Sequence, residues 1–255
     1  MAEPEVFPAQ IEPAPAAGNA PIAPVWHTVL IVAVLLLFSL GGSHSQALAV
    51  QRHGRISLYV STIIFEWVLV AIIWLGLRTR GVRLRELIGG RWSTPEDLLL
   101  DTAIAVVYLF VADMLLAVLK LALGLASVNQ AAQAKQVQQI KDTLGFIVPH
   151  GMHENVAFLL LVISAGFCEE LIYRGYLQRA LTALAGSAAV GVVTQAILFG
   201  ASHGYQGAKN MAVIAVYGSF FGLLAHWRKS LRPGMMAHFA QDFFSVLLLK
   251  FFFKL

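Results

Sequence analysis

Long apolar runs separated by short polar segments dominate this chain. A helix needs about 20 apolar residues to cross the hydrocarbon core of a bilayer. Seven runs approach or exceed this length, so the pattern predicts an all-α fold, a polytopic transmembrane bundle of about seven spans. The predicted spans are Val25–Leu40, Leu58–Leu77, Leu98–Ala126, Val156–Leu177, Ser187–Ser202, Met211–Trp227 and Met235–Leu249.

Two segments outside these spans have a different character. Residues 1–24 are rich in Pro and Ala, acidic and without a basic residue, which predicts a disordered tail before a transmembrane domain at 25–255. A cleaved signal peptide would require a short basic leader, which this tail lacks. The Gln- and Ala-rich stretch Ser127–Asp142 predicts a short helix outside the membrane.

The composition supports the membrane assignment. The chain of 255 residues is 58% hydrophobic and 13% charged, whereas soluble domains carry about 25% charged residues. This balance excludes a soluble globular enzyme, and it also excludes a disordered protein, which would be rich in charge. The net charge of +4 does not indicate a nucleic-acid partner, because the basic residues fall in short loops between spans.

The basic residues also predict the orientation of the bundle. Lys and Arg concentrate in the cytoplasmic loops of membrane proteins. The densest group of arginines lies between the second and third predicted spans, at 78–91. We therefore expect the amino terminus inside and the carboxyl terminus outside.

Ionisable residues inside apolar helices are costly and are candidate functional groups by default. The first such group is Glu169-Glu170-x-x-x-Arg174. Glu170 and Arg174 are four residues apart on one helix face and are expected to form an ion pair. Glu169 points about 100° away and suits general acid–base chemistry. The alternative is that the helix has reached the interface, where these charges are solvated.

Two further groups carry histidines, Phe199-x-x-x-His203 and His238-x-x-x-Asp242. Glu169 and His203 each lie seventeen positions from Gly186, the turn of an expected antiparallel helical hairpin. Equal distances from the turn place both side chains at one depth, so we expect them to face each other. His238 follows the loop at 228–233 and shares a helix face with Asp242. The alternative for each histidine is a buried, hydrogen-bonded structural role.

A pocket of this composition permits few reactions. A Glu–His pair can deprotonate a water, and a second His with an Asp can stabilise the oxyanion at an attacked carbonyl. Together these steps describe hydrolysis of an amide or ester. We expect Cys168 to have a packing role. Zinc is the alternative, with Glu169, His203 and His238 as ligands, although the helical signature of zinc proteases is absent.

The three groups together resemble the motifs of the CAAX-processing and bacteriocin-processing (CPBP, or Abi) family of intramembrane proteases, which includes the Ras-converting CAAX prenyl endopeptidases. The resemblance covers about residues 155–245. It implies that Glu169 acts as general base on water with help from His203. It implies that Glu170 and Arg174 shape the pocket, and that His238 and Asp242 stabilise the oxyanion.

One position departs from the family pattern, because Asp242 stands where many members have Asn. A carboxylate donates a hydrogen bond only when protonated, so Asp242 is expected to orient His238 or to help bind a metal. The resemblance leaves a glutamic and a metallo-type endopeptidase open. The first needs no cofactor and the second needs zinc.

The resemblance also implies partners and a location. We expect a membrane-associated peptide or protein substrate, with its lipidation left open, and no nucleic acid. We expect an integral, multi-pass protein of a bacterial plasma membrane.

Two other functions remain alternatives at this stage. One is a non-catalytic immunity or regulatory protein of the same fold. The other is a proton-linked transporter with Glu169, Asp113 and Lys120 as a relay, although no internal repeat supports it. Asp101, Asp113 and Lys120 lie in the third predicted span, where a buried ion pair between helices is the expected arrangement.

Overall fold

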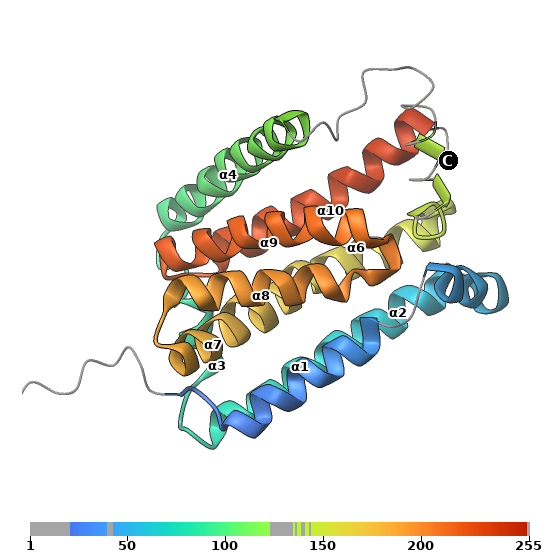
Figure 1. Cartoon of the computed structure of the whole chain (residues 1–255). Coiled ribbons are helices and arrows are strands. Elements are labelled where there is room, and N and C mark those ends of the chain that lie inside the picture. The colour runs from blue at the N-terminus through green and yellow to red at the C-terminus, as the bar shows by residue number, and fades with distance from the viewer. Residues whose placement is uncertain are drawn as a thin grey trace, which may run out of the picture.

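The computed structural model of the chain describes residues 21–39, 43–122, 135, 137–138, 141–142 and 144–253. These residues are mostly helical and contain no strand (Figure 1). The all-α prediction is therefore confirmed. Residues 1–20 of the predicted tail and most of Ser127–Asp142 lie outside the described residues.

The helices follow one another with short connections. They are α1 (Val25–Ser39), α2 (Ser43–Arg78), α3 (Leu84–Ile88), α4 (Pro95–Ala122), α6 (Gly151–Glu169), the π-helix η1 (Glu170–Leu177), α7 (Gln178–Ala185), α8 (Ala188–Ser202), the 3₁₀-helix η2 (Gly204–Gln206), α9 (Ala208–Arg228) and α10 (Arg232–Phe253).

Each predicted span overlaps at least one of these helices, but not all of the helices are equally long. By length and composition, four described segments can cross a membrane, namely Gln46–Arg78, Pro95–Ala122, Gly151–Ala185 and Ala208–Arg228. α1 and α8 are apolar but shorter. The polytopic bundle is confirmed, and the count of seven spans is approximate.

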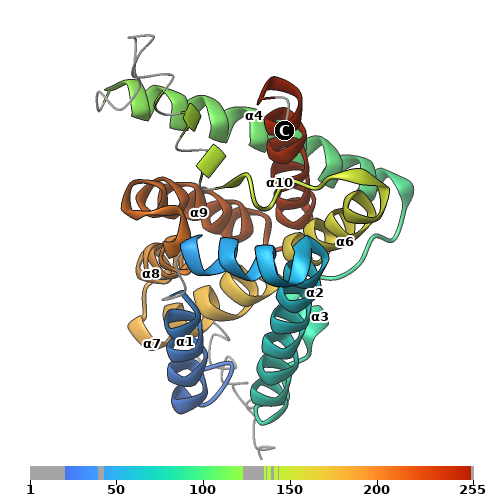
Figure 2. The same ribbon diagram turned by 90° about the vertical axis from the view of Figure 1, so that its right-hand side faces the viewer.

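The second span begins earlier than predicted. α2 starts at Ser43 rather than near Leu58, and it bends at Gly54, which has a φ of 80°. Glycine adopts this left-handed conformation without steric cost. Figure 2 shows the part of α2 before the bend running at a steep angle to the rest.

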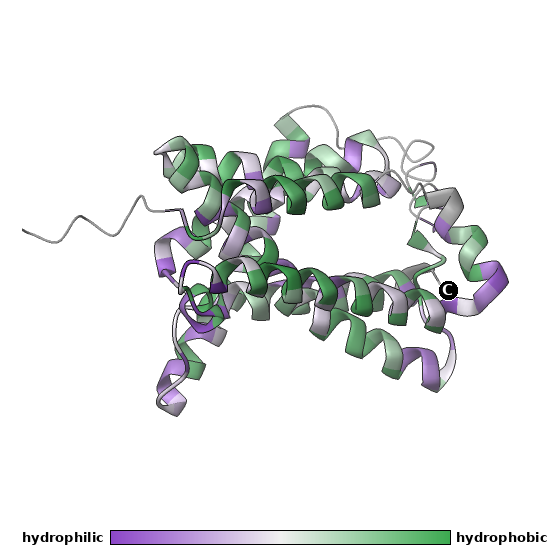
Figure 3. Ribbon diagram, turned by 90° about the horizontal axis from the view of Figure 1, so that it is seen from below, coloured by the Kyte–Doolittle hydropathy of each residue, from purple (hydrophilic) through white to green (hydrophobic). Residues whose placement is uncertain are grey.

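The outer surface of the bundle is apolar. Large side chains such as Phe110, Ile64 and Leu160 are more than half exposed, and Figure 3 shows hydrophobic residues along the helices and hydrophilic ones mainly near their ends. A soluble monomer rarely exposes contiguous apolar surface on this scale. The chain is therefore an integral membrane protein, with lipid as the partner of this surface.

The predicted antiparallel hairpin is present. α7 ends at Ala185, Gly186 adopts the left-handed conformation with a φ of 66°, and the Ser187 side chain accepts a hydrogen bond from the Val190 amide at the start of α8. A left-handed glycine ends one helix and a serine caps the next. This turn returns the chain so that α8 packs along α7 and η1.

The arginine-rich loop and the later turns meet at one end of the bundle. Arg179 donates hydrogen bonds to the carbonyls of Glu86 and Leu87, and the Leu231 amide donates to the Ile88 carbonyl. The segments that the sequence assigns to the inner side therefore share an end of the structure. Which side of the membrane this end faces stays a prediction.

Asp101 provides the buried ion pair between helices. Its carboxylate is fully buried and accepts hydrogen bonds from Trp92 Nε1 at 2.9 Å and Arg228 at 2.9 Å. It also pairs with Arg232 at 3.0 Å. This contact joins α4 to α9 and α10.

Asp113 and Lys120 do not form such a pair, so the expectation is wrong for these two residues. Asp113 is exposed and accepts a hydrogen bond from the Tyr217 hydroxyl at 3.2 Å. No ion pair joins Asp113 to Lys120 within the described part of α4. Seven residues advance about 10 Å along a helix, too far for these two side chains to meet easily.

Replacement of Asp101 tests the importance of this contact. We expect Asp101→Ala to lower the free energy of unfolding by about 3 kcal/mol, because two arginines lose their buried counter-charge. The measurement is denaturant unfolding in detergent micelles. Glu96→Ala, at an exposed position of the same helix, is the control and should change stability by less than about 0.5 kcal/mol. If Asp101→Ala and Glu96→Ala lowered the free energy of unfolding equally, the stabilising role assigned to the Asp101 ion pairs would be wrong.

Candidate active site

The site begins where α6 changes into the π-helix η1. All eight residues of η1, Glu170–Leu177, are buried. π-Turns are rare and occur frequently at functional sites. Because the π-helix has more residues per turn than an α-helix, side chains from Glu170 onward take directions that a regular helical wheel does not give.

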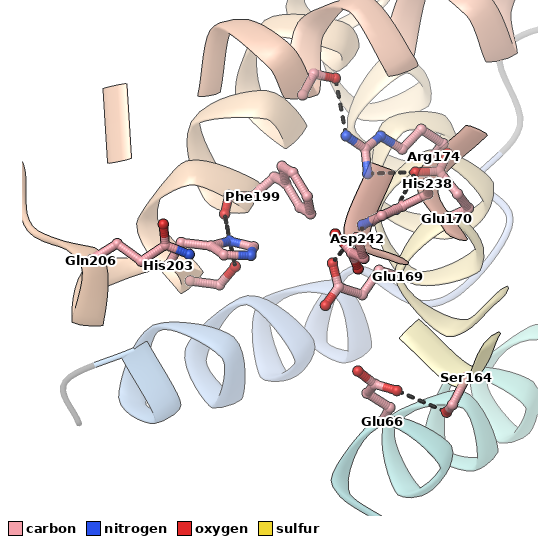
Figure 4. Close-up of polar contacts among 12 residues, drawn as sticks. Glu66, Ser164, Glu169, Glu170, Arg174, Phe199, His203, Gln206, His238 and Asp242 are labelled. Atoms are coloured by element: carbon pink, nitrogen blue, oxygen red, sulfur yellow. Dashed lines mark hydrogen bonds and ion pairs between the residues drawn. The ribbon is translucent and has the colours of Figure 1, made fainter. Parts of the chain in front are cut away.

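Glu170 forms the centre of the polar contacts. Its Oε1 accepts hydrogen bonds from Arg174 Nη1 at 2.9 Å and from His238 Nδ1 at 3.0 Å (Figure 4). The Glu170 and Arg174 side chains are almost completely buried. The ion pair expected from their spacing is therefore present. Its burial argues against the alternative of solvated interfacial charges.

Arg174 is held by more than its carboxylate partner. Its Nη2 donates to the Gly218 carbonyl of α9 at 3.2 Å. The guanidinium also lies 4.3 Å from the ring centroid of Phe199 and 5.0 Å from that of Phe221. Such cation–π contacts strengthen when water is excluded. Arg174 thus connects η1 to α8 and α9.

His238 is oriented by Glu170. A carboxylate can only accept, so the Nδ1 that faces Glu170 carries the proton. Its Nε2 then points to the other side, 3.5 Å from Glu169 Oε2 and 3.8 Å from Asp242 Oδ2. Both separations are longer than a hydrogen bond. The orienting carboxylate of His238 is therefore Glu170, and Asp242 lies beside the opposite ring nitrogen.

His203 lies apart from Glu169, Glu170 and His238 (Figure 4). It follows α8, and its Nδ1 donates to the Phe199 carbonyl at 2.8 Å. The Phe199 ring is near both imidazoles, with centroids 4.9 Å from His203 and 5.8 Å from His238. Nδ1–H donation leaves the lone pair of a neutral His203 on Nε2.

The direct contact expected between Glu169 and His203 is not found in the described structure. The imidazole in contact with Glu169 is that of His238 instead. Two local features explain the difference, because His203 turns back to its own helix and the π-helix changes the register after Glu169. Asp242 nevertheless lies close enough to both imidazoles for its charge to interact with them.

A close helix contact brings His238 to the glutamates. A Cβ added to Gly166 of α6 would lie 2.9 Å from the Phe239 amide nitrogen and 3.0 Å from the Met235 carbonyl oxygen of α10. Real side chains avoid such distances. Glycine at this position therefore allows α10 to approach α6, and His238 reaches Glu169 and Glu170 as a result.

Glu66 is a buried carboxyl that the sequence reasoning missed. It lies on α2 and accepts a hydrogen bond from Ser164 Oγ of α6 at 2.9 Å. It is close enough to Glu169, His238 and Asp242 for their charges to interact. The sequence does distinguish this residue, because Glu66 is the sole acidic residue within the predicted span Leu58–Leu77.

Cys168 is buried in the main apolar cluster, and its Sγ lies 3.8 Å from Ser164 Oγ. This environment agrees with the packing role expected from the sequence.

The residues named as zinc ligands do not fit that metal. A catalytic zinc site requires three protein donors around one point, each about 2 Å from the ion. Glu169 and His238 are neighbours, but His203 does not join them. Among the described residues, no group of three His, Cys, Asp or Glu side chains is placed to hold a metal ion.

Comparison with known proteins identifies one family. Residues 152–244 match the family model described as type II CAAX prenyl endopeptidase, Rce1-like. The match runs from α6 into α10 and includes all three motifs, so the resemblance inferred from them is confirmed. No curated protein and no solved structure matches the chain significantly.

Removing the guanidinium tests the buried pair. We expect Arg174→Met to lower the free energy of unfolding by about 3–5 kcal/mol, because Glu170 becomes a buried charge without its cation. The double variant Glu170→Gln/Arg174→Met should recover most of this loss. Unfolding in detergent gives the measurement.

Arg179→Met is the matched control, since Arg179 is only partly buried and donates to backbone carbonyls. It should cost about 1 kcal/mol. If Arg179→Met lowered the free energy of unfolding as much as Arg174→Met, the ion pair with Glu170 would contribute no more to stability than an ordinary arginine contact.

Proposed function

We propose that this chain, whose residues 152–244 match the Rce1-like family model of type II CAAX prenyl endopeptidases, hydrolyses a peptide bond of a membrane-associated substrate with a water activated by Glu169. Glu169 itself provides the observation that supports this proposal. Its Oε2 is buried without a hydrogen-bond partner, although the side chain remains partly accessible. A carboxylate with a free oxygen beside an imidazole suits the role of general base.

The reaction requires two proton transfers. Glu169 takes a proton from water while Nε2 of His203 accepts a hydrogen bond from the same water. The hydroxide oxygen bonds to the carbonyl carbon, and the π electrons move to the carbonyl oxygen. The carbon–nitrogen bond then breaks, and Glu169 returns its proton to the leaving amine. The carbonyl double bond re-forms as the carbon–nitrogen bond breaks, and the products are a carboxylic acid and a free amine.

His238 is assigned to the oxyanion. When protonated on both nitrogens, it donates from Nδ1 to Glu170 and from Nε2 toward the reacting side. Donors fixed before the reaction stabilise the developing charge most effectively. Asp242 lies on the same side as Nε2. A protonated Asp242 would supply a second donor, where many family members have Asn.

The substrate is proposed to be a peptide anchored in the bilayer. The site lies among helices with lipid-facing outer surfaces, so a membrane-bound segment can reach it without crossing bulk water. The name of the matched family points to prenylated carboxyl-terminal CAAX sequences, which are the first probes to use. A glutamic mechanism fits the arranged side chains better than a zinc mechanism.

The alternatives receive less support. The proposed transport relay would need Asp113 near Glu169, but Asp113 lies on the exposed side of α4 and contacts Tyr217. A non-catalytic immunity protein of the same fold would need the contacts among Glu170, Arg174 and His238 for assembly, but it would not need the unpartnered Glu169 oxygen beside His238.

Activity of site variants tests the proposal. The assay follows cleavage of a fluorogenic, farnesylated CAAX peptide and its unprenylated counterpart by protein in lipid nanodiscs. Glu169→Gln and His203→Asn should each reduce kcat/KM about 10²–10⁴-fold, because the first removes the general base and the second removes the imidazole that orients the water. Glu96→Gln should behave as wild type. Unchanged cleavage by folded Glu169→Gln would reject the proposed mechanism.

Metal removal is expected to leave the activity intact, because the ligating atoms of Glu169, His203 and His238 are not placed around one point where an ion could bind. The measurement is cleavage of the same peptide after dialysis against a chelator. A loss of activity that zinc restores would contradict the glutamic mechanism.

A further inference from the structure

We infer that Glu66, a residue of α2 outside the family-matched segment, is a positioning residue for Glu169. Ser164 fixes one of its carboxyl oxygens, and the other carries a proton and acts as a hydrogen-bond donor toward Glu169. This inference rests on the proposed function, because it gives Glu66 a part in preparing Glu169 to receive a proton from water.

The geometry around Glu66 is well defined. Glu66 and Ser164 are 5% and 6% exposed, at the packed contact between α2 and α6. The Ser164 hydroxyl donates to Oε2 at 2.9 Å. This is the one hydrogen bond that the described structure gives Glu66, and Figure 4 shows the other oxygen on the side of Glu169.

The titratable groups that face Glu66 are mostly acidic. From α6 it faces Glu169 and the Cys168 thiol, and from α10 it faces His238 and Asp242. No Lys or Arg of the described chain forms an ion pair with it. An ionised carboxylate buried at membrane depth without a Lys or Arg partner is costly, and it would also repel Glu169.

A neutral carboxylic acid resolves this conflict. Oε2 accepts from Ser164, so the proton is on Oε1, which then donates to the Glu169 carboxylate or to a water bound between the two. Such a donor stabilises the ionised form of Glu169 and restricts its rotation. The base is thereby held in the orientation that proton abstraction requires.

This role differs from simple packing, which an apolar residue of similar size would fulfil. Glu66→Leu keeps the volume and removes both polar contacts. Glu66→Gln keeps an acceptor for Ser164 and an N–H donor for Glu169, and it carries no charge. The two variants therefore separate a positioning role from a structural one.

The experiment combines kinetics with infrared spectroscopy in nanodiscs. With the farnesylated peptide as probe, Glu66→Leu should lose about 100-fold in kcat at unchanged KM, with unfolding stability at least equal to wild type. Glu66→Gln should retain kcat close to wild type. The wild-type spectrum should contain the carbonyl stretch of a protonated carboxylic acid, which disappears in Glu66→Gln and shifts in Ser164→Ala.

Ser61→Ala is the matched control for Ser164→Ala. The Ser61 hydroxyl lies at an exposed position of α2 and donates to its own helix at Leu58, so this variant should leave both the band and kcat unchanged.

The outcomes distinguish this inference from the proposed function. If Glu169→Gln is inactive while Glu66→Leu has the wild-type kcat, Glu66 is not a positioning residue and the protease assignment stands. If Glu169→Gln remains active, the assignment fails. Absence of a Glu66 carbonyl band overturns the inference whatever the activity.

Discussion

The arrangement of this protein depends on one buried carboxylate. Glu170 accepts from Arg174 on its own helix and from His238 on α10, at 2.9 Å and 3.0 Å. Arg174 in turn reaches the backbone of α9 at Gly218. In a bilayer, apolar side chains gain little by packing on one another rather than on lipid. Polar contacts of this kind therefore fix how the helices assemble, and the same contacts orient the imidazole at the candidate site.

The sequence predicts much of this arrangement, because the periodicity and the cost of buried charge are local properties. Apolar runs give the helices, Gly186 and Ser187 give the hairpin, and the spacing of Glu170 and Arg174 gives their ion pair. The three motifs also predict the resemblance to CAAX prenyl endopeptidases, which the family-model match over residues 152–244 confirms.

The remaining details depend on three-dimensional contacts that spacing does not encode. Counting residues from the turn at Gly186 cannot anticipate the π-helix at 170–177, so it pairs Glu169 with His203 instead of His238. It also cannot show that Gly166 lets α10 approach, which decides which imidazole reaches the glutamates. Glu66 was missed for a different reason, because it lies outside the three motifs. Its position as a single acidic residue in an apolar span would have identified it.

Helix α4 shows what the membrane setting implies for motion. It is exposed along most of its length, and among the described residues its polar contacts to other helices are at Asp101 and Asp113. Lipid chains can replace its apolar contacts at small cost. Polar contacts therefore hold α4 to the bundle at Asp101 and Asp113, so a change in bilayer thickness or lipid order acts on the part of α4 after Asp113 before it disturbs the glutamates.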